Sequence, residues 1–262
     1  MAFNLKQGFR GIVRIDGSRY VRVTSADIQV RQEAQTFLPT YGGRRLKRIW
    51  HRGTGDITGT LSLMLCENDA EWLYGLADEQ EEFYMDLHYY GSKDRRFLGC
   101  KIQELTFNCA AGEIVAVTVN VVAKDVGPRV RSLEFTKGQK LVTWDKCDVR
   151  FPIPTFFGDD LQSFTYTVNN GLKSIKTAAG LFPKILNPAI QEVSGQFQFY
   201  NKDDIVIPPD GAYEYGLGFR NVRFRIDDLE LEHDVVFHPN QIIPLVPASL
   251  ISTISWSRSD DF

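Results

Sequence analysis

The chain has 262 residues, of which 43% are hydrophobic, and a formal net charge of −3. This length fits one large domain or two of about 130 residues, and the hydrophobic content excludes wholesale disorder. Neither half of the chain has the strongly basic balance of a duplex-DNA-binding domain.

The four cysteines lie far apart in the sequence and form no CxxC pair. A disulfide scaffold packs more cysteines into fewer residues, so we expect free thiols and a reducing compartment. The N-terminal residues show no apolar signal core, and no segment approaches the about 20 apolar residues of a membrane helix. The sequence therefore predicts a protein that is made and kept in a cytosol, or assembles there, with no membrane partner. The cysteines are Cys66, Cys100, Cys109 and Cys147.

The N-terminal part predicts an arm, two strands and a long connection. Residues 1–18 read as an extended arm that either frays or docks on a neighbouring subunit. Arg19–Val23 and Asp27–Glu33 predict two short strands. Residues 34–55 contain Pro39 and several glycines and predict a long polar excursion. Connections longer than about 12–15 residues are uncommon in compact domains and are often functional.

The stretch from Asp56 to Gln80 is the clearest local pattern. Asp56–Leu65 alternates with a two-residue period, which predicts a half-buried strand. Asn68 with Glu71 three residues later predicts a capping box at a helix start. Apolar residues then follow at helical spacing, so we expect an amphipathic helix that covers a sheet. These residues are Ala70, Trp72, Leu73, Leu76 and Ala77.

Further strands follow the helix. Glu82–Tyr90 alternates, and Phe97–Cys109 with Glu113–Ala123 predicts a hairpin across Ala110–Gly112. The second strand of this hairpin is rich in β-branched residues, which favour strands. Lys124–Lys140 contains a Gly-Pro pair and mixed charge, and predicts a linker.

Beyond this linker the pattern of the first half returns. Four segments of the first half have ordered echoes in the second, so we expect tandem copies of one module over residues 1–130 and 131–262. The second copy has a larger excursion, Pro152–Ile190, and lacks the helix, because Asn201–Gly218 is short and contains two prolines. The predicted fold class is mainly β, with two tandem β-sandwich or half-barrel modules, the first with a flanking α-helix. The paired segments are Thr24–Arg31 with Thr143–Arg150, Thr36–Gly42 with Ile153–Gly158, Ile57–Leu65 with Val193–Phe199, and Lys101–Phe107 with Arg225–Leu231.

No catalytic, cofactor or metal site is predicted. His51, His88, His233 and His238 lie in four separate segments without metal-ligand spacing. The chain has no GxSxG elbow, no Walker loop, and no GxGxxG before a helix. We interpret the carboxylate pairs as solvated turn residues. These pairs are Asp159-Asp160, Asp203-Asp204 and Asp227-Asp228.

The run Arg44–Arg52 concentrates positive charge in the first excursion. It predicts either a nucleic-acid contact, with Trp50 available for stacking, or a contact with an acidic surface of a neighbouring subunit, for instance Asp78–Glu82. The second interpretation suits a near-neutral chain better. The two excursions, Thr36–Arg52 and Thr155–Pro188, and the arms are the predicted interfaces. The individual residues are Phe37, Tyr41, Arg44, Arg45, Lys47, Arg48, Trp50, Arg52, Phe156 and Phe157.

The order of these features resembles a known family. Gly55–Leu65, Asn68–Leu76 and Leu105–Val122 are similar to the strand, acidic helix and closing hairpin of the tail tube proteins of tailed bacteriophages. The resemblance implies a β-sandwich with a flanking helix, whose sheets join between subunits into a continuous barrel around a channel for DNA. Family tubes usually have one module per chain in a hexameric ring, so two modules imply a trimeric ring with pseudo-sixfold symmetry.

We therefore expect a structural, non-enzymatic virion protein without cofactors, assembled in the host bacterial cytoplasm. Its expected partners are itself in stacked trimeric or hexameric rings, transient non-specific DNA in the lumen, and other tail proteins (tape measure, baseplate or terminator, and sheath where present). One alternative is a tail-end adaptor or baseplate hub (distal tail) protein of the same fold. Another is a β-sandwich carbohydrate-binding module or enzyme that uses Tyr84, Tyr89 and Tyr90. Alternation alone does not say which face of a sheet meets DNA.

A variant that lacks Tyr41–Arg52 is expected to fold and not to stack.

Overall fold

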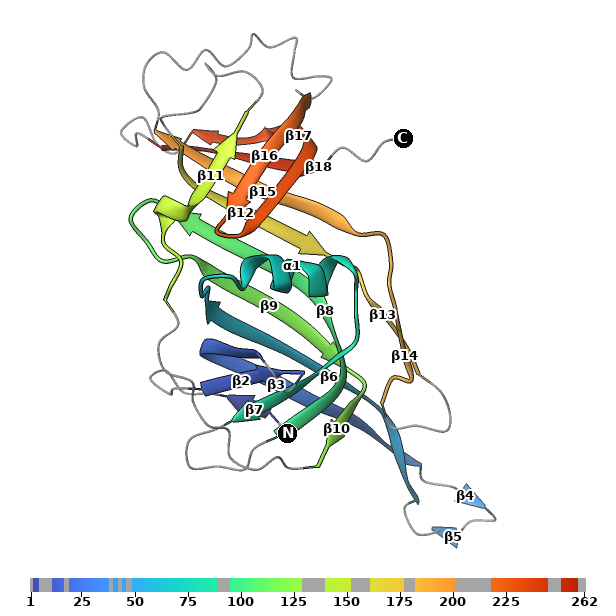
Figure 1. Cartoon of the computed structure of the whole chain (residues 1–262). Helices are drawn as coiled ribbons and strands as arrows, with labels where there is room; N and C mark the ends of the chain where they lie inside the picture. The colour runs from blue at the N-terminus through green and yellow to red at the C-terminus, as the bar shows by residue number, and fades with distance from the viewer. Residues whose placement is uncertain are drawn as a thin grey trace.

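The computed structural model of the chain is almost entirely β-structure (Figure 1). The residues that it describes are 2–4, 11–16, 19–37, 40–41, 44–45, 49–88, 95–128, 140–151, 161–176, 182–200, 218–244 and 251–258. Within them the predicted mainly β fold class is confirmed, and α1 (Ala70–Asp78) is the α-helix of the described part.

The strands divide into those before and those after residue 130. In the first half they are β1 (Ala2–Asn4), β2 (Gly11–Ile15), β3 (Arg19–Phe37), β4 (Thr40–Tyr41), β5 (Arg44–Arg45), β6 (Ile49–Met64), β7 (Phe83–His88), β8 (Arg95–Ala110), β9 (Ala116–Ala123) and β10 (Asp125–Gly127). In the second half they are β11 (Cys147–Arg150), β12 (Leu161–Asn169), β13 (Lys173–Ile175), β14 (Ile185–Asn187), β15 (Glu192–Tyr200), β16 (Gly218–Ile226), β17 (Leu229–Pro244) and β18 (Ile251–Arg258).

The first half closes into a six-stranded barrel. Its strands pair in the order β8-β7-β2-β3-β6-β9, and β9 pairs back with β8. The two-residue period sends alternate side chains inward, so Ile57, Leu61 and Leu63 of β6 are buried while Thr58 and Thr60 are exposed. The predicted strand over Asp56–Leu65 and the hairpin of β8 and β9 are confirmed.

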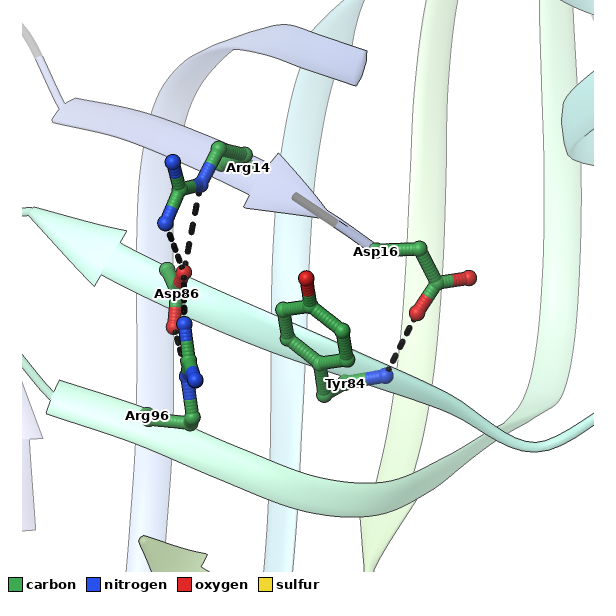
Figure 2. A network of polar contacts seen from close by, with 5 residues as sticks. All are labelled: Arg14, Asp16, Tyr84, Asp86 and Arg96. Carbon is green, nitrogen blue, oxygen red and sulfur yellow. Dashed lines mark hydrogen bonds and ion pairs between the residues drawn. The ribbon is translucent and has the colours of Figure 1, made fainter. Parts of the chain in front are cut away.

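A buried carboxylate ties three neighbouring barrel strands together (Figure 2). The Asp86 side chain of β7 is 2% exposed and accepts hydrogen bonds from Arg14 of β2 and Arg96 of β8. The guanidinium of Arg96 also lies 4.6 Å from the ring centroid of Tyr84. Burial by itself raises the pKa of Asp86, but hydrogen bonds from Arg96 and Arg14 outweigh burial and hold that pKa below its ordinary value.

The second half uses the same strand order. We number the six barrel strands of each half from 1 to 6 in chain order. In the first half these strands pair in the order 1-2-3-6-5-4; they are β2, β3, β6, β7, β8 and β9. The strands β11, β12, β15, β16, β17 and β18 make five of the six equivalent pairings within the described residues. The sixth, between β11 and β12, would involve residues 152–160, which lie outside the described part.

The two halves join edge to edge through β8 and β12. Glu104–Ala110 of β8 pairs antiparallel with Ser163–Asn169 of β12. This joint makes one continuous eight-stranded sheet in the order β17-β18-β15-β12-β8-β9-β6-β3. Its apolar face forms the core, in which a cluster of aromatic side chains fills the second half. The cluster contains Phe164, Tyr166, Phe197, Phe224, Phe237 and Trp256.

Helix α1 lies over the joint between the halves (Figure 1). It packs on β8 and β17, and buries Ala70, Leu73, Leu76 and Ala77. Asn170, which is fully buried, donates hydrogen bonds to the carbonyl oxygens of Ala77 and Ile102 at 2.7 and 3.0 Å. The helix therefore stabilises the arrangement of both halves, as its predicted apolar stripe requires.

The predicted capping box at the start of α1 is wrong. The N-cap residue is Asp69, and its side chain makes no capping hydrogen bond. Instead, the backbone N–H groups of Asn68 and Glu71 donate to the carboxylates of Asp227 and Asp228, at 2.8 and 3.3 Å. Negative charge near a helix N-terminus is favourable, so this carboxylate pair, which lies at a turn as predicted and is half-buried, also makes a structural contact between the halves.

The predicted strand bounds and excursions also need correction. The segments Arg19–Val23 and Asp27–Glu33 belong to the single strand β3, which has an irregularity between Val23 and Ser25. The predicted polar excursion is largely a hairpin, because β3 continues to Phe37 and β6 begins at Ile49. The expected arm contains the strands β1 and β2. The second predicted excursion, Pro152–Ile190, is also wrong in part, because β12, an inner strand of the sheet, and the pair β13 and β14 lie within it.

Among the four sequence echoes, the position of one agrees with the strand order. Ile57–Leu65 and Val193–Phe199 lie mainly in β6 and β15, which are third in rank in their halves. Lys101–Phe107 lies within β8, whereas Arg225–Leu231 crosses the turn between β16 and β17. Thr24–Arg31 lies in β3, second in rank, whereas Thr143–Arg150 contains a 3₁₀ turn and β11, first in rank. The echo of Thr36–Gly42 at Ile153–Gly158 and the absent second helix at residues 201–217 fall outside the described part.

Candidate functional surfaces

The polar face of the eight-stranded sheet is the first candidate surface. Side chains on this face alternate with core residues along every strand, and residues paired across strands share a face. Most are neutral hydroxyl and amide side chains. They are Thr58, Thr60, Thr106, Asn108, Thr118, Asn120, Ser163, Thr165, Thr167, Ser194, Gln196, Gln198, Thr253, Ser255 and Ser257.

Hydrogen bonds connect these side chains from strand to strand. Thr60 donates to Asn120 at 2.7 Å, and Asn120 donates to Glu104 at 3.1 Å, so one row spans β6, β9 and β8. The hydroxyls of Thr106 and Thr167 lie 3.0 Å apart across the joint of β8 and β12. The polar face is therefore continuous over the joint between the halves.

Charge on this face is low and of mixed sign. A shallow hollow over β3, β6, β9 and β8 contains two carboxylates, Asp27 and Glu104, and one guanidinium, Arg31. The guanidinium donates two hydrogen bonds to the side chain of Gln29, at 2.9 and 3.1 Å. Each phosphate that a protein neutralises adds to its affinity for DNA, so this face is suited to weak contact with a polyanion.

The hairpin of β3 and β6 is the second candidate surface. It projects away from the barrel, and β4 and β5 pair near its tip (Figure 1). Six of the predicted interface residues lie on its strands, which brings the basic excursion together on one projection. These are Phe37, Tyr41, Arg44, Arg45, Trp50 and Arg52. Lys47, Arg48, Phe156 and Phe157 lie outside the described residues.

The histidines and tyrosines are the other residues that the sequence analysis considered for a binding or metal site. No group of three or more metal-ligating side chains is present in the described part of the chain. Tyr84 packs beneath Arg96, while Tyr89 and Tyr90, its predicted neighbours in a glycan site, fall outside the described residues. No helix that the structure describes is long and apolar enough to cross a membrane. The four cysteines are free, as predicted, and all four are buried.

His233 is half-buried beside the aromatic core and predicts a pH dependence of stability. Its Nε2 lies 2.6 Å from the hydroxyl of Tyr166, and burial lowers the pKa of His233 from 6.5 to about 4. Between these two values the unfolded chain binds more protons than the folded one, so the free energy of unfolding falls as pH falls through this window. We expect the urea midpoint to drop between pH 7 and pH 4.5, and to drop less in His233→Gln. The exposed His238, changed to Gln, is the control; an equal drop in all three proteins would contradict this assignment.

Sequence reasoning missed the identity of the polar face and the role of the Asp227-Asp228 turn. The alternating pattern gave two faces for each strand, and the structure distinguishes them, because the apolar residues of these strands are buried in one core and the hydroxyl and amide residues between them mostly are not. The local sequence carried no signal for the carboxylate contacts with α1, which join residues 157 and 159 positions apart.

Part of the chain matches a known protein family. A family model described as phage tail tube protein matches residues 74–207, which run from α1 across the joint between the halves. No curated protein matches the chain.

Proposed function

Because this chain belongs to the phage tail tube protein family, and so is a structural component of a phage tail, we propose that it is the major tail tube subunit. In this proposal the chain forms rings that stack into a tube, and the polar face of the eight-stranded sheet lines the channel through which DNA passes. The chain has no catalytic role in this process.

The continuous eight-stranded sheet is the observation that carries the proposal. One face of the sheet is core, and the other presents mainly neutral polar side chains. Within the described residues its outer strands are paired on the far side over part of their length, β3 with β2 and β1, and β17 with β16 as far as Val236. Unpaired stretches of a strand edge are a hazard for aggregation unless neighbouring chains pair with them. Pairing in a closed ring removes the edges and gives a defined symmetry.

The shared strand order supports two modules, residues 1–130 and 131–262, in each chain. Each module contributes four strands to the sheet, in equivalent order. A ring of three chains would then have six modules and would form a pseudo-sixfold tube. The family match spans residues 74–207 and crosses this boundary, so support for the division comes from the strand order.

The low charge of the polar face supports a channel through which DNA slides. A lumen that bound many phosphates would hold the DNA by counterion release and resist its movement. Polar groups that are hydrogen bonded to each other, such as those of Thr60, Asn120 and the carboxylate of Glu104, are also less available to the DNA. The projecting hairpin of β3 and β6 supports stacking, because it extends beyond the barrel where the next ring would lie.

Electron microscopy of the purified chain tests this function. We expect rings with threefold symmetry, or pseudo-sixfold at low resolution, and tubes of stacked rings at high protein concentration. Isolated rings that never stack would instead favour a tail-end adaptor or baseplate hub. Monomers at every concentration would contradict both.

A further inference from the structure

We propose that the joint of β8 and β12 inside the chain is a template for the joint between chains. In the second joint, residues 238–244 of β17 pair with β3 around Gln29 of the next copy. We also propose that β1 covers this edge of β3 before assembly. This inference rests on the proposed function, since it requires the chain to form rings.

The template is the pairing between the two halves. In β12, Ser163–Asn169 has β15 on one side and β8 on the other. In β8, the pairing partner on one edge changes along the strand, from β7 at residues 95–100 to β12 at Glu104–Ala110. Thus β12, the second strand of its half, joins the C-terminal end of β8, the fifth strand of the other half.

Two glycines align the halves. Gly59 of β6 lies opposite Ile28 of β3, and Gly195 of β15 lies opposite Tyr166 of β12. A Cβ at Gly59 would come within 2.7 Å of the Ile28 side chain, and one at Gly195 within 2.0 Å of a backbone oxygen of β12. Both positions require the same close approach of neighbouring strands. Ile28 is therefore equivalent to Tyr166, and Gln29 to Thr167.

The same glycines align β17 with β8. On its other side, Gly59 pairs with Val121 of β9, which pairs with Ile102 of β8. In the same way, Gly195 pairs with Trp256 of β18, which pairs with Phe237 of β17. Beyond Ile102, β8 joins β12. Beyond Phe237, β17 continues to Pro244, and no strand in the described part pairs with residues 238–244 on the side away from β18.

The register of the new joint follows from these equivalences. In the template, Thr106 lies opposite Thr167. In the first half, Thr106 pairs with Thr118, which lies three residues before Val121. In the second half, Ile243 pairs with Thr253, which lies three residues before Trp256. Ile243 is therefore the equivalent of Thr106, and it should lie opposite Gln29 of the next copy.

The β3 edge that this joint needs is already occupied. Ala2, Phe3 and Asn4 of β1 pair with Gln29, Ile28 and Asp27. These β3 positions are equivalent to residues 165–167, which pair with β8 in the template. A neighbouring β17 and the chain's own β1 therefore compete for the same backbone groups. A short strand that covers an edge prevents early pairing, so β1 acts as a plug that leaves when chains associate.

Disulfide trapping tests the register. In the double variant Gln29→Cys/Ile243→Cys, mild oxidation of assembled protein is expected to give covalent oligomers between chains, because paired residues bring their Cβ atoms within disulfide range. The variant Thr24→Cys/Ile243→Cys is the matched control, since position 24 lies five residues along β3 and should not cross-link. The native cysteines are buried. Cross-linking of the control to the same extent would overturn the register.

A second pair of variants tests the plug. Deletion of residues 2–4 is expected to give a roughly tenfold lower protein concentration for half-maximal assembly, which corresponds to about 1.4 kcal/mol of competing pairing. In Ala2→Cys/Gln29→Cys, oxidation locks β1 onto β3 and should abolish assembly until a reductant is added. Assembly that is unaffected by the lock, or weakened by the deletion, would overturn the role of β1.

These outcomes separate the inference from the proposed function. Rings or tubes without cross-linking between positions 29 and 243 would overturn the joint and leave the tube subunit intact. A failure of all variants and of the unmodified chain to form rings would overturn the function itself.

Discussion

Replacement of residues 38–48 by Asn-Gly is expected to leave rings intact and to abolish tubes. The pairing of β3 and β6 reaches Phe37 and Ile49, and the two residues Asn-Gly form the preferred tight turn between antiparallel strands. The change removes the tip of the projecting hairpin, including β4 and β5, and touches no described residue of the barrel core. Stacking contacts made by this tip would be lost while contacts within a ring remain.

Electron microscopy and sedimentation of the shortened variant measure this effect, and thermal unfolding verifies that the subunit is folded. Arg44→Gln/Arg45→Gln keeps the length of the hairpin and removes two charges of β5, so it separates an effect of charge from one of shape. If charge attraction drives stacking, tubes of the unmodified chain should dissociate at high salt, because salt screens exposed charges. The charge variant should then form fewer tubes already at low salt. Tubes of normal length from the shortened variant would show that rings stack through other surfaces.

The elements predicted correctly were those with a strong local period. Asp56–Leu65, the hairpin of β8 and β9, and α1 each show enough consecutive alternation or helical spacing to identify them without tertiary information. The hairpin of β3 and β6 was missed, because its strands extend beyond the core and pair through backbone groups, which require no apolar period. Two segments of similar sequence, Lys101–Phe107 and Arg225–Leu231, were equated although one continues as a strand and the other turns.

The candidate surfaces depended on contacts that no single segment encodes. Periodicity placed Thr106 and Thr167 each on the polar face of its own strand, but the joint that brings their hydroxyls to 3.0 Å links residues 61 positions apart. The same holds for Asp86, whose partners come from two other strands. In an alternating pattern of polar and apolar residues, a carboxylate is predicted to be exposed. Only the partners of Asp86 in the folded chain show that it is buried.

Asp86→Asn is expected to destabilise the barrel more than any other single charge removal discussed for this chain. The carboxylate is 2% exposed and faces two guanidinium groups, so its loss leaves two cations close together with no counter-charge. Removing one partner of a buried ion pair costs about 3–5 kcal/mol, and we expect the lower end, about 3 kcal/mol, because Arg14 and Arg96 can turn toward water. Their side chains are 19% and 28% exposed.

Urea unfolding at pH 7 measures the loss, and Asp148→Asn supplies the control. Asp148 and Arg150 form an exposed pair at 2.8 Å, for which about 0–1 kcal/mol is expected. The pKa of Asp86 is lowered in the folded state, so its contribution is complete above the ordinary carboxyl pKa and is lost as pH falls through the folded value. The difference between wild type and Asp86→Asn should therefore be constant from pH 7 to pH 5 and shrink in stronger acid. Equal losses of unfolding free energy in the two variants would contradict this role of Asp86. The barrel strands would then be stabilised by their backbone hydrogen bonds and apolar core alone, and the carboxylate would only offset the charge of its two arginines.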